Sequence, residues 1–298
     1  EVRTVAGYPG GSPAAGPVRF SRLLEEAAGI AWTGWDASDE GSLFVSEERG
    51  HSLRRLKLKR AQLGQPWLWE IEDFAGVAGQ PGHADGTLAA SRFFGPSGLA
   101  FDPAARILYV AESANQVVRA VRVDEPESPG CVTTVAGVPG RLGFRDGAAG
   151  EALFHGPTAL ALDAEDGLYV ADTQNHRVRR VDLGTGEVLT VLGTGRPGSS
   201  GVGAPAISYP VDAPGGLAVD AWGNLFVSSR DSVREVTRSE LGSVASGQGR
   251  VLTLYGPSSP ASLGSLTQCF SGLLLDGDGS LFALDQCQGV LLRFARQE

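Results

Sequence analysis

Hydrophobic and polar residues alternate along this chain in a unit that recurs five times. Each unit opens with an apolar pair behind a small residue, passes through Asp and a turn into an alternating strand, and continues into a second alternating strand rich in basic residues. The units begin at Gly29, Gly98, Ala159, Gly216 and Gly272, so successive starts lie 69, 61, 57 and 56 residues apart. Self-similarity at a nearly fixed period indicates a repeat architecture.

The third copy shows the elements of one unit most clearly. Its alternating segments predict four short strands, separated by a turn at Gly167 and a polar turn at 173–176. Period-2 alternation between Gly, Asn and Asp turns is typical of a short antiparallel meander. The four expected strands cover residues 158–163, 168–172, 177–183 and 188–193, and the other copies repeat the second strand at 43–46, 108–111, 225–228 and 281–284.

Four antiparallel strands per unit, with no helical periodicity, predict an all-β fold: a β-propeller of five four-stranded blades. The last copy lacks a fourth strand, and residues 1–7 read as a fourth strand without a preceding three. The N-terminal strand is therefore expected to close the last blade, within a single domain of residues 1–298. A six-bladed or incomplete six-bladed ring is the alternative. The blades are expected at 29–76, 98–137, 158–193, 215–256 and 272–295 plus 1–7.

Charge and composition narrow the possible functions. The net charge of -9 argues against a general nucleic-acid binder, which usually carries a basic surplus. The densest basic run, from Arg54 to Arg60, is interpreted as a solvated outer strand whose charges prevent edge pairing. No apolar stretch reaches the roughly 18 residues of a membrane span, so direct membrane insertion is not expected. The chain starts almost directly in a repeat, which suggests part of a larger protein or assembly.

Long connections between the blades are the expected binding surface. They run over 7–28, 76–96, 137–157, 193–214 and 256–271 and are expected to emerge on one face. Loops of such length in a compact domain are usually functional or disordered. Phe93 and Phe154 are expected to anchor two of them to the blades. The candidate binding residues on this long-loop face are His83, Asp85, Arg141, Arg145, Asp146 and His155.

Catalytic chemistry is weakly represented. The sequence contains no nucleophile elbow, phosphate loop or Cys-His pairing, so no catalytic residue, metal or cofactor is expected. His83 and His155 lie in long loops, and with Asp85 or Asp146 they leave a zinc site open as an alternative.

The cysteines point to a compartment. Cys269 and Cys287 are centred on the turn at 276–279, so a regular hairpin would place them opposite each other. Opposed residues in a hairpin lie about 4.5–5.5 Å apart by Cα, within disulfide reach. The predicted bridge favours an oxidising environment, and hence an extracytoplasmic or secreted protein. Cys131 is left either buried as a small hydrophobic residue or paired with another chain.

Residues 168–181 (LYVADTQNHRVRRV) resemble the NHL-repeat family, with its name-giving Asn and His at Asn175 and His176. The second copy keeps Asn115 but has Gln116 in place of His. The resemblance implies a propeller in which Asp172, Asn175, His176 and Arg177 form a structural repeat turn that hydrogen-bonds within itself and to the neighbouring blade.

Together these features favour a non-catalytic propeller that recognises a protein or glycan through the long-loop face. The alternative is a metal-dependent propeller hydrolase or lyase at the channel mouth, with His83 and His155 as ligands. An RNA-binding NHL domain needs a basic face, and the charge balance speaks against it.

Overall fold

The structure is a computed structural model. It describes residues 27–35, 40–59, 68–124, 127–128, 131–199, 203–237, 249–256, 270–276, 279–285 and 290–294. The described part is all-β apart from two short 3-10 helices, η1 (Thr173–Asn175) and η2 (Ala206–Ser208). No helix among these residues has the length and apolarity to cross a bilayer.

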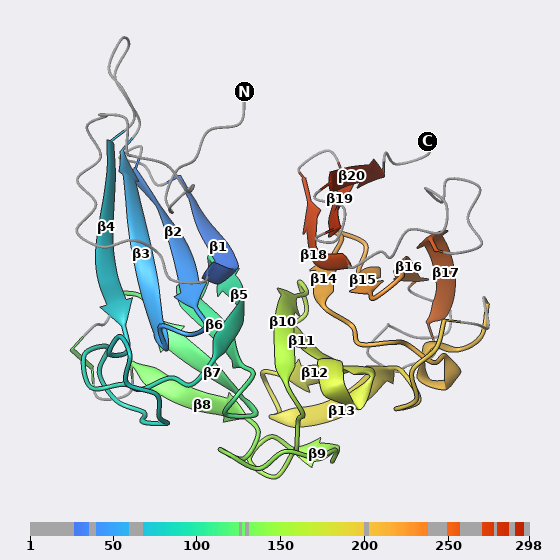
Figure 1. The fold of residues 1–298 in the computed structure, drawn as a ribbon, viewed down its shortest axis with the longest axis horizontal. Helices are drawn as coiled ribbons and strands as arrows, with labels where there is room; N and C mark the ends of the chain where they lie inside the picture. Colours follow the sequence, from blue (N-terminus) through green and yellow to red (C-terminus); the bar gives the residue numbers. More distant parts are fainter. Residues whose placement is uncertain are drawn as a thin grey trace. The chain divides into compact units, whose positions relative to one another are not determined.

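Five antiparallel sheets make up the five-bladed propeller arrangement (Figure 1). The first is β1 (Ala27–Trp35), β2 (Glu40–Glu47), β3 (Ser52–Lys59) and β4 (Leu68–Ala75), and the second is β5 (Pro96–Asp102), β6 (Ile107–Glu112), β7 (Val117–Arg122) and β8 (Val132–Ala136). The third is β10 (Pro157–Leu162), β11 (Gly167–Asp172), β12 (Arg177–Asp182) and β13 (Glu187–Leu192), with β9 (Gly147–Ala148) added at its edge. The fourth is β14 (Gly216–Val219), β15 (Leu225–Ser229), β16 (Ser232–Thr237) and β17 (Arg250–Tyr255), and the fifth is β18 (Phe270–Leu275), β19 (Leu281–Asp285) and β20 (Val290–Phe294).

The alternation therefore predicted the fold class correctly. In the third sheet the expected second strand, 168–172, is observed as Gly167–Asp172, and the expected fourth, 188–193, as Glu187–Leu192. Apart from β9, the strands of each sheet lie side by side in sequence order, which makes each sheet an antiparallel meander. The predicted closing strand, residues 1–7, lies outside the described residues.

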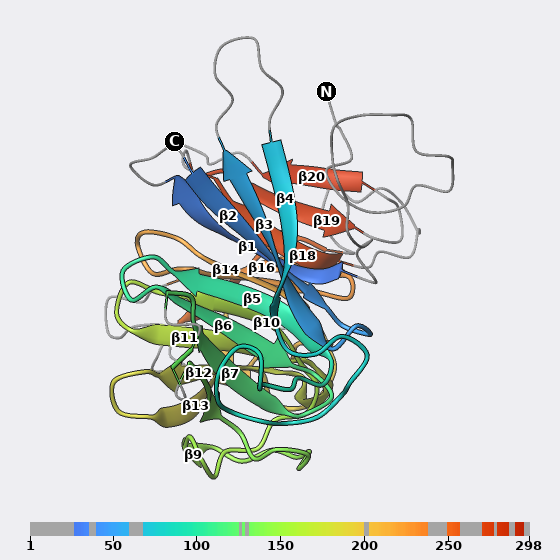
Figure 2. The same cartoon turned by 90° about the vertical axis from the view of Figure 1, so that its left-hand side faces the viewer.

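The chain separates into two compact units, one of residues 1–115 and 119–134 and the other of 116–118 and 135–298. In the first unit the opening strands β1 and β5 lie side by side (Figures 1 and 2). Its core contains Phe44, Phe93 and Val110, all fully buried. In the second unit β14 lies between β10 and β18, and the core around it includes Val178, Tyr209 and Val227.

The described connecting loops follow a shared path along sheet edges. Gly86 pairs with Val132 of β8, β9 pairs with β13, and Pro205 pairs with Arg250 of β17. Each of these loops thus runs along the outer strand of the sheet that follows it in the chain. Covering an outer strand satisfies backbone groups that would otherwise offer an edge for aggregation.

Candidate functional site

A buried arginine occupies the same position on the third strand of the first four sheets. These residues are Arg54, Arg119, Arg179 and Arg234, each at most 2% exposed, while the fifth sheet has Leu292 at this position. The expectation of a solvated outer strand is therefore wrong for Arg54, because β3 lies between β2 and β4 and turns this side chain inward. A buried guanidinium needs hydrogen-bonding partners of its own, since desolvation of the charge is costly.

Arg179 obtains its partners from β11 and from the loop before β10. It donates to the carboxylate of Asp172 at 3.0 Å and, through Nε, to that of Asp146 at 2.8 Å. It also donates to the carbonyl oxygens of Arg145 at 2.7 Å and Leu153 at 3.1 Å. Its guanidinium carbon lies 5.2 Å from the ring centre of Phe154. One side chain thus fixes three separate points of the loop.

Arg119 repeats this arrangement in the first unit. It donates to Glu112 and to Asp85, both at 2.6 Å. The carbonyl oxygens of Ala84 and Arg92 accept at 2.9 and 3.2 Å, and the ring centre of Phe93 lies 5.2 Å away. Phe93 and Phe154 are fully buried, as expected of loop anchors.

The acidic residue at the end of β11 links the turn that follows it to the loop before β10. Asp172 accepts from the backbone N–H of His155 at 2.7 Å and from the Asn175 amide at 2.8 Å. Asn175 also donates to the Gly143 carbonyl at 2.7 Å. Burial raises the pKa of the Asp172 carboxyl, against the lowering effect of its donors.

The second sheet has the same connections. Glu112 accepts from the N–H of Phe94 at 2.7 Å, and Asn115 donates to Glu112 and to the Gly82 carbonyl. Burial raises the pKa of Glu112 as well, although Arg119 favours its ionised form.

The residue after this turn lies in the left-handed region and reaches the start of the next sheet. It is His51, Gln116 or His176, with φ of 55°, 64° and 51°. The side chains accept hydrogen bonds from the N–H groups of Gly95 at 3.3 Å, Gly156 at 2.6 Å and Ala213 at 3.1 Å, respectively. Each donor lies shortly before the first strand of the following sheet. His176 thus connects its turn to the start of the next sheet, and the neighbouring Asn175 connects it to the loop at Gly143.

The predicted binding residues fall into two groups. Asp85 accepts hydrogen bonds from Arg119 and from the Thr134 hydroxyl. Asp146 accepts hydrogen bonds from Arg179 and from the Thr190 hydroxyl. His83 Nε2 lies 2.9 Å from the Thr134 hydroxyl, and burial lowers the pKa of its imidazole. His155 is half-buried; its backbone N–H donates to Asp172, and its carbonyl oxygen accepts from the Gln174 N–H at 3.0 Å. Arg141 and Arg145 are exposed on the loop before β10.

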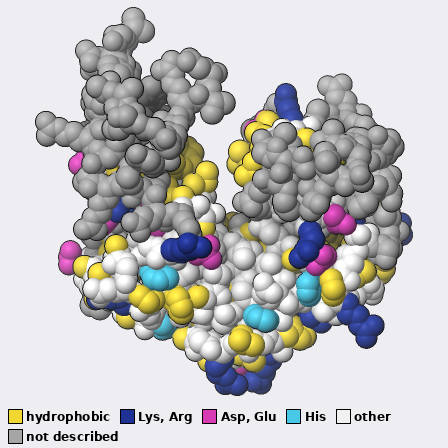
Figure 3. All heavy atoms as spheres, in the orientation of Figure 1, with side chains coloured by type: hydrophobic (Ala, Val, Ile, Leu, Met, Phe, Trp, Pro, Cys, Tyr) yellow, Lys and Arg dark blue, Asp and Glu magenta, His cyan; other side chains and the backbone are white. Residues whose placement is uncertain are grey.

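The sequence analysis did not select two exposed apolar residues that lie between those arginines. Leu142 is 63% and Phe144 is 44% exposed, and the Phe144 ring centre lies 3.8 Å from the Arg177 guanidinium carbon. The signal was present as the run RLGFR at 141–145 in an otherwise acidic chain. Figure 3 shows basic side chains (dark blue) gathered near β9, with hydrophobic ones (yellow) close by. We call Arg141, Leu142, Phe144 and Arg145 the basic–aromatic patch.

The structure describes only part of the residues on which the cysteine and metal predictions depend. Cys131 is fully buried, and its thiol donates to the Arg122 carbonyl at 3.1 Å. Cys269 and Cys287 lie outside the described residues, so their bridge stays a prediction. Within the described ranges, no three His, Cys, Asp or Glu side chains form a group that could hold a metal ion.

Five successive antiparallel meander sheets, with the three described connecting loops each along the outer strand of the next sheet, are typical of a β-propeller. Residues 77–206 match the family model described as the SMP-30/Gluconolactonase/LRE-like region. This part of the chain is therefore similar to a propeller region of the SMP-30/gluconolactonase type.

Curated relatives carry such a region as a small part of a longer chain. Protein SUPPRESSOR OF QUENCHING 1, chloroplastic, from Arabidopsis thaliana is 28% identical over 190 residues, which is 59% of this chain and 17% of that protein. NHL repeat-containing protein 2 from Homo sapiens is 29% identical over 158 residues, which is 50% of this chain and 20% of that protein.

Solved structures agree on the fold. One in a nidogen/laminin complex has a TM-score of 0.54 at 13% identity, covering 91% of this chain and 76% of that chain. A candidate gluconolactonase has a TM-score of 0.53 at 13% identity, covering 91% and 77%. At such identity the likeness shows the propeller fold alone.

Proposed function

We propose that this protein is a non-catalytic, protein-binding propeller that holds a partner on the basic–aromatic patch. The observation that carries the proposal is the exposure of Leu142 and Phe144, on a loop whose backbone is fixed from beneath by Arg179. Exposed apolar side chains on a well-held loop mark interaction sites more often than scattered ones do.

The composition of the patch fits an energetic centre of an interface. Aromatic residues and arginine are enriched among the residues that dominate binding energy. Phe144 stacks with Arg177 at 3.8 Å, which orients the ring before any partner arrives. A pre-oriented side chain loses little conformational entropy on binding.

The charges of the patch indicate the partner's chemistry. Arg141 and Arg145 stand on either side of the apolar pair, in a chain of net charge -9. Arg145 is 59% exposed, and its recorded partner Glu151 is equally accessible at 64%, so a partner carboxylate can compete for it. The partner expected is an acidic protein segment with an apolar side chain, because carboxylates pair with guanidinium in a bidentate geometry.

An exchange of loop surfaces tests this proposal. The variant Arg141→Gln, Leu142→Pro, Phe144→His and Arg145→Ala gives this loop the residues of the equivalent loop at 79–86. The probe is an immobilised library of peptides with Glu and Asp around Phe, Trp or Leu, against a library of reversed charge. We expect the natural protein to retain acidic peptides and the exchanged variant to lose them.

The reverse exchange is the matched control. Gln80→Arg, Pro81→Leu, His83→Phe and Ala84→Arg place the patch on the first unit's loop. A gain of acidic-peptide binding there, in the background of the exchanged variant, would support the patch as the cause. Equal retention by the natural and exchanged proteins would refute the proposal.

A second candidate function is favoured by the family region itself. Since residues 77–206 match an SMP-30/gluconolactonase model, a metal-dependent lactone hydrolase with His83 and His155 as ligands is the alternative. An assay of aldonolactone hydrolysis, monitored through the protons released, with and without added Ca²⁺, Mn²⁺ or Zn²⁺, distinguishes this hydrolase from the binding propeller. Metal-dependent turnover that His83→Ala or His155→Ala abolishes would replace the binding proposal.

The extracytoplasmic location is part of the proposal and rests on the expected Cys269–Cys287 bridge. Mass spectrometry of an unreduced proteolytic digest tests it. A disulfide-linked peptide pair supports the location, and two free thiols in protein secreted through an oxidising pathway speak against it.

A further inference from the structure

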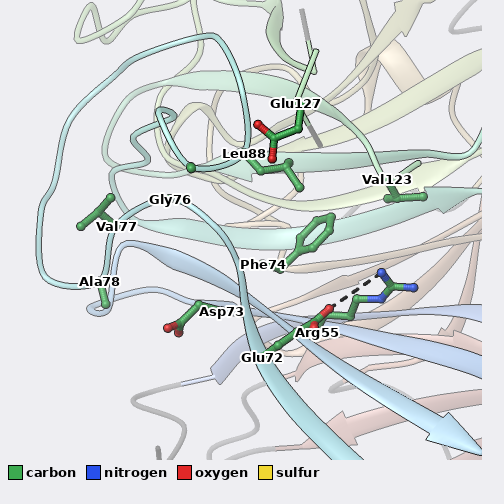
Figure 4. A pocket seen from close by; sticks show the side chains of 11 residues that line it. Arg55, Glu72, Asp73, Phe74, Gly76, Val77, Ala78, Leu88, Val123 and Glu127 are labelled. Carbon is green, nitrogen blue, oxygen red and sulfur yellow. Dashed lines mark ion pairs between the residues drawn. The ribbon is translucent and has the colours of Figure 1, made fainter. Parts of the chain in front are cut away.

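A cleft in the first unit carries an inference independent of the basic–aromatic patch. It has a volume of about 660 Å³, within the range of sites that hold a small ligand or a few side chains. Figure 4 shows Phe74 between two walls, with Leu88 and Glu127 on one side and Arg55, Glu72 and Asp73 on the other. Val77, Ala78 and Val123 add apolar surface.

The cleft is preformed, because its floor and one wall are tied down. Phe74 packs on the fully buried Phe44, with ring centres 4.7 Å apart. Leu88 is held by two hydrogen bonds to its carbonyl oxygen, from the Gly76 N–H at 3.2 Å and the Ser91 hydroxyl at 2.7 Å. A ligand would therefore meet apolar surface that needs little rearrangement.

The rim of the cleft is acidic. Three carboxylates, from Glu72, Asp73 and Glu127, face a single lining cation, Arg55. Glu72 pairs with Lys57 at 2.8 Å and with Arg55 at 3.8 Å (dashed line in Figure 4), and Asp73 pairs with Arg54 at 2.7 Å. Glu127 is exposed, and none of the ion pairs recorded among the described residues involves it.

We propose that this cleft binds a short basic–apolar segment of a protein partner. An apolar side chain of the segment packs against Phe74, Val77 and Leu88, while an adjacent Lys or Arg pairs with the exposed carboxylate of Glu127. Opposite charges at the rim favour this segment over an acidic one and speed its approach at low salt. The cleft thus selects a ligand opposite in charge to that of the basic–aromatic patch.

Fluorescence anisotropy with labelled pentapeptides tests the proposal on the full chain. The probes are Gly-Lys-Phe-Lys-Gly, its acidic counterpart Gly-Glu-Phe-Glu-Gly, and Gly-Lys-Ser-Lys-Gly without the apolar residue. We expect saturable binding of the first alone, weakened by about tenfold when the salt is raised from 50 to 500 mM.

Paired variants locate the binding. Glu127→Lys should weaken the basic peptide about tenfold, whereas Glu187→Lys, the same charge change at an exposed site in the other unit, should leave it within about twofold. Ala89→Trp should fill the cleft and abolish binding, whereas Ala90→Trp, next to it but outside the lining, should not.

Four results would overturn the proposal: no saturable binding, equal binding of the acidic peptide, equal binding of the serine peptide, or equal effects of the two tryptophan variants. Circular dichroism of each variant confirms that it is folded before its affinity is compared. These readouts do not involve the patch, so failure here leaves the proposed function standing, and the reverse also holds.

Discussion

The loops at 77–95 and 138–156 have the same length and the same internal hydrogen bonds, yet they display different surfaces. The N–H of Gly82 donates to the Phe93 carbonyl at 3.1 Å, and that of Gly143 donates to the Phe154 carbonyl at 3.0 Å. Beneath them lie Arg119 and Arg179. Four equivalent surface positions nevertheless carry different residues: Gln80, Pro81, His83 and Ala84 in one loop, and Arg141, Leu142, Phe144 and Arg145 in the other.

The comparison shows that buried side chains fix the backbone of these loops, whereas the exposed side chains give each loop its own surface chemistry. The fourth sheet extends the lesson, because Arg234 serves its loop without a recorded carboxylate partner among the described residues. It donates to the Tyr209 hydroxyl at 2.8 Å and to the Ser199 carbonyl at 3.0 Å. The buried arginine therefore recurs at the same position in these sheets, while the groups that accept its hydrogen bonds differ from sheet to sheet.

Replacing the buried arginines should have the largest effect on the stability of the protein. Arg119→Met and Arg179→Met each leave a buried carboxylate unpaired, so each should lower the free energy of unfolding by about 3–5 kcal/mol. Arg234→Met leaves only neutral acceptors and should cost about 1–3 kcal/mol. Urea unfolding followed by tryptophan fluorescence measures all three, and a larger loss for Arg234→Met would contradict the assignment of partners.

The titration of the buried carboxylates of Glu112 and Asp172 should change the stability of the protein in the same direction. Burial raises the folded pKa of Glu112 and Asp172 above their ordinary values of 4.5 and 3.8. Between the ordinary and the raised pKa the folded protein binds more protons than the unfolded one, so stability falls as pH rises through that window. The loss is about 1.4 kcal/mol for each unit of pKa difference.

Glu112→Gln removes one of these titrations and sharpens the test. The stability of the natural protein relative to this variant should decline as pH rises from 4.5 through the raised pKa. Urea unfolding at several pH values across the window supplies the comparison. A relative stability that instead grows with pH would mean that pairing with Arg119 outweighs burial.

The loop carboxylates should matter less. Asp85 and Asp146 are 44% and 35% exposed, so solvent screens their pairs with the arginines. Asp85→Asn and Asp146→Asn should each cost about 1 kcal/mol, and by similar amounts. Unfolding midpoints of the two variants give the comparison, with Asp166→Asn, in a turn outside both networks, as the control.

Exchanging the exposed loop residues should have the smallest effect on stability. Surface substitutions of this kind change the free energy of unfolding by about 0.5 kcal/mol or less. The exchanged variant at 141–145 should therefore unfold at nearly the natural urea concentration while losing acidic-peptide binding. A large loss of stability would show that Leu142 or Phe144 contributes to the fold.

Strand order and turns could be predicted because alternation and Gly, Asn or Asp turns are local signals. The expected segment 225–228 in the fourth copy lies within β15. The role of Arg179 could not be predicted, because its partner Asp146 lies 33 residues away and a basic residue in an alternating strand reads as solvated. Asp85 and Asp146 were selected as binding residues for the same reason: their exposure was assumed, and their arginine partners were not visible in the sequence.

The residue in the left-handed conformation after the turn between the second and third strands connects successive sheets with different acceptor groups. At two of these connections the acceptor is an imidazole, His51 or His176, and at the third it is the amide of Gln116. An imidazole accepts here through Nδ1 only as the tautomer that carries its proton on Nε2, whereas the carbonyl oxygen of an amide has no tautomer to fix. His51→Gln and His176→Gln should therefore keep the hydrogen bonds from the Gly95 and Ala213 N–H groups, with hydrogen exchange at both amides unchanged, whereas His51→Ala and His176→Ala should speed it.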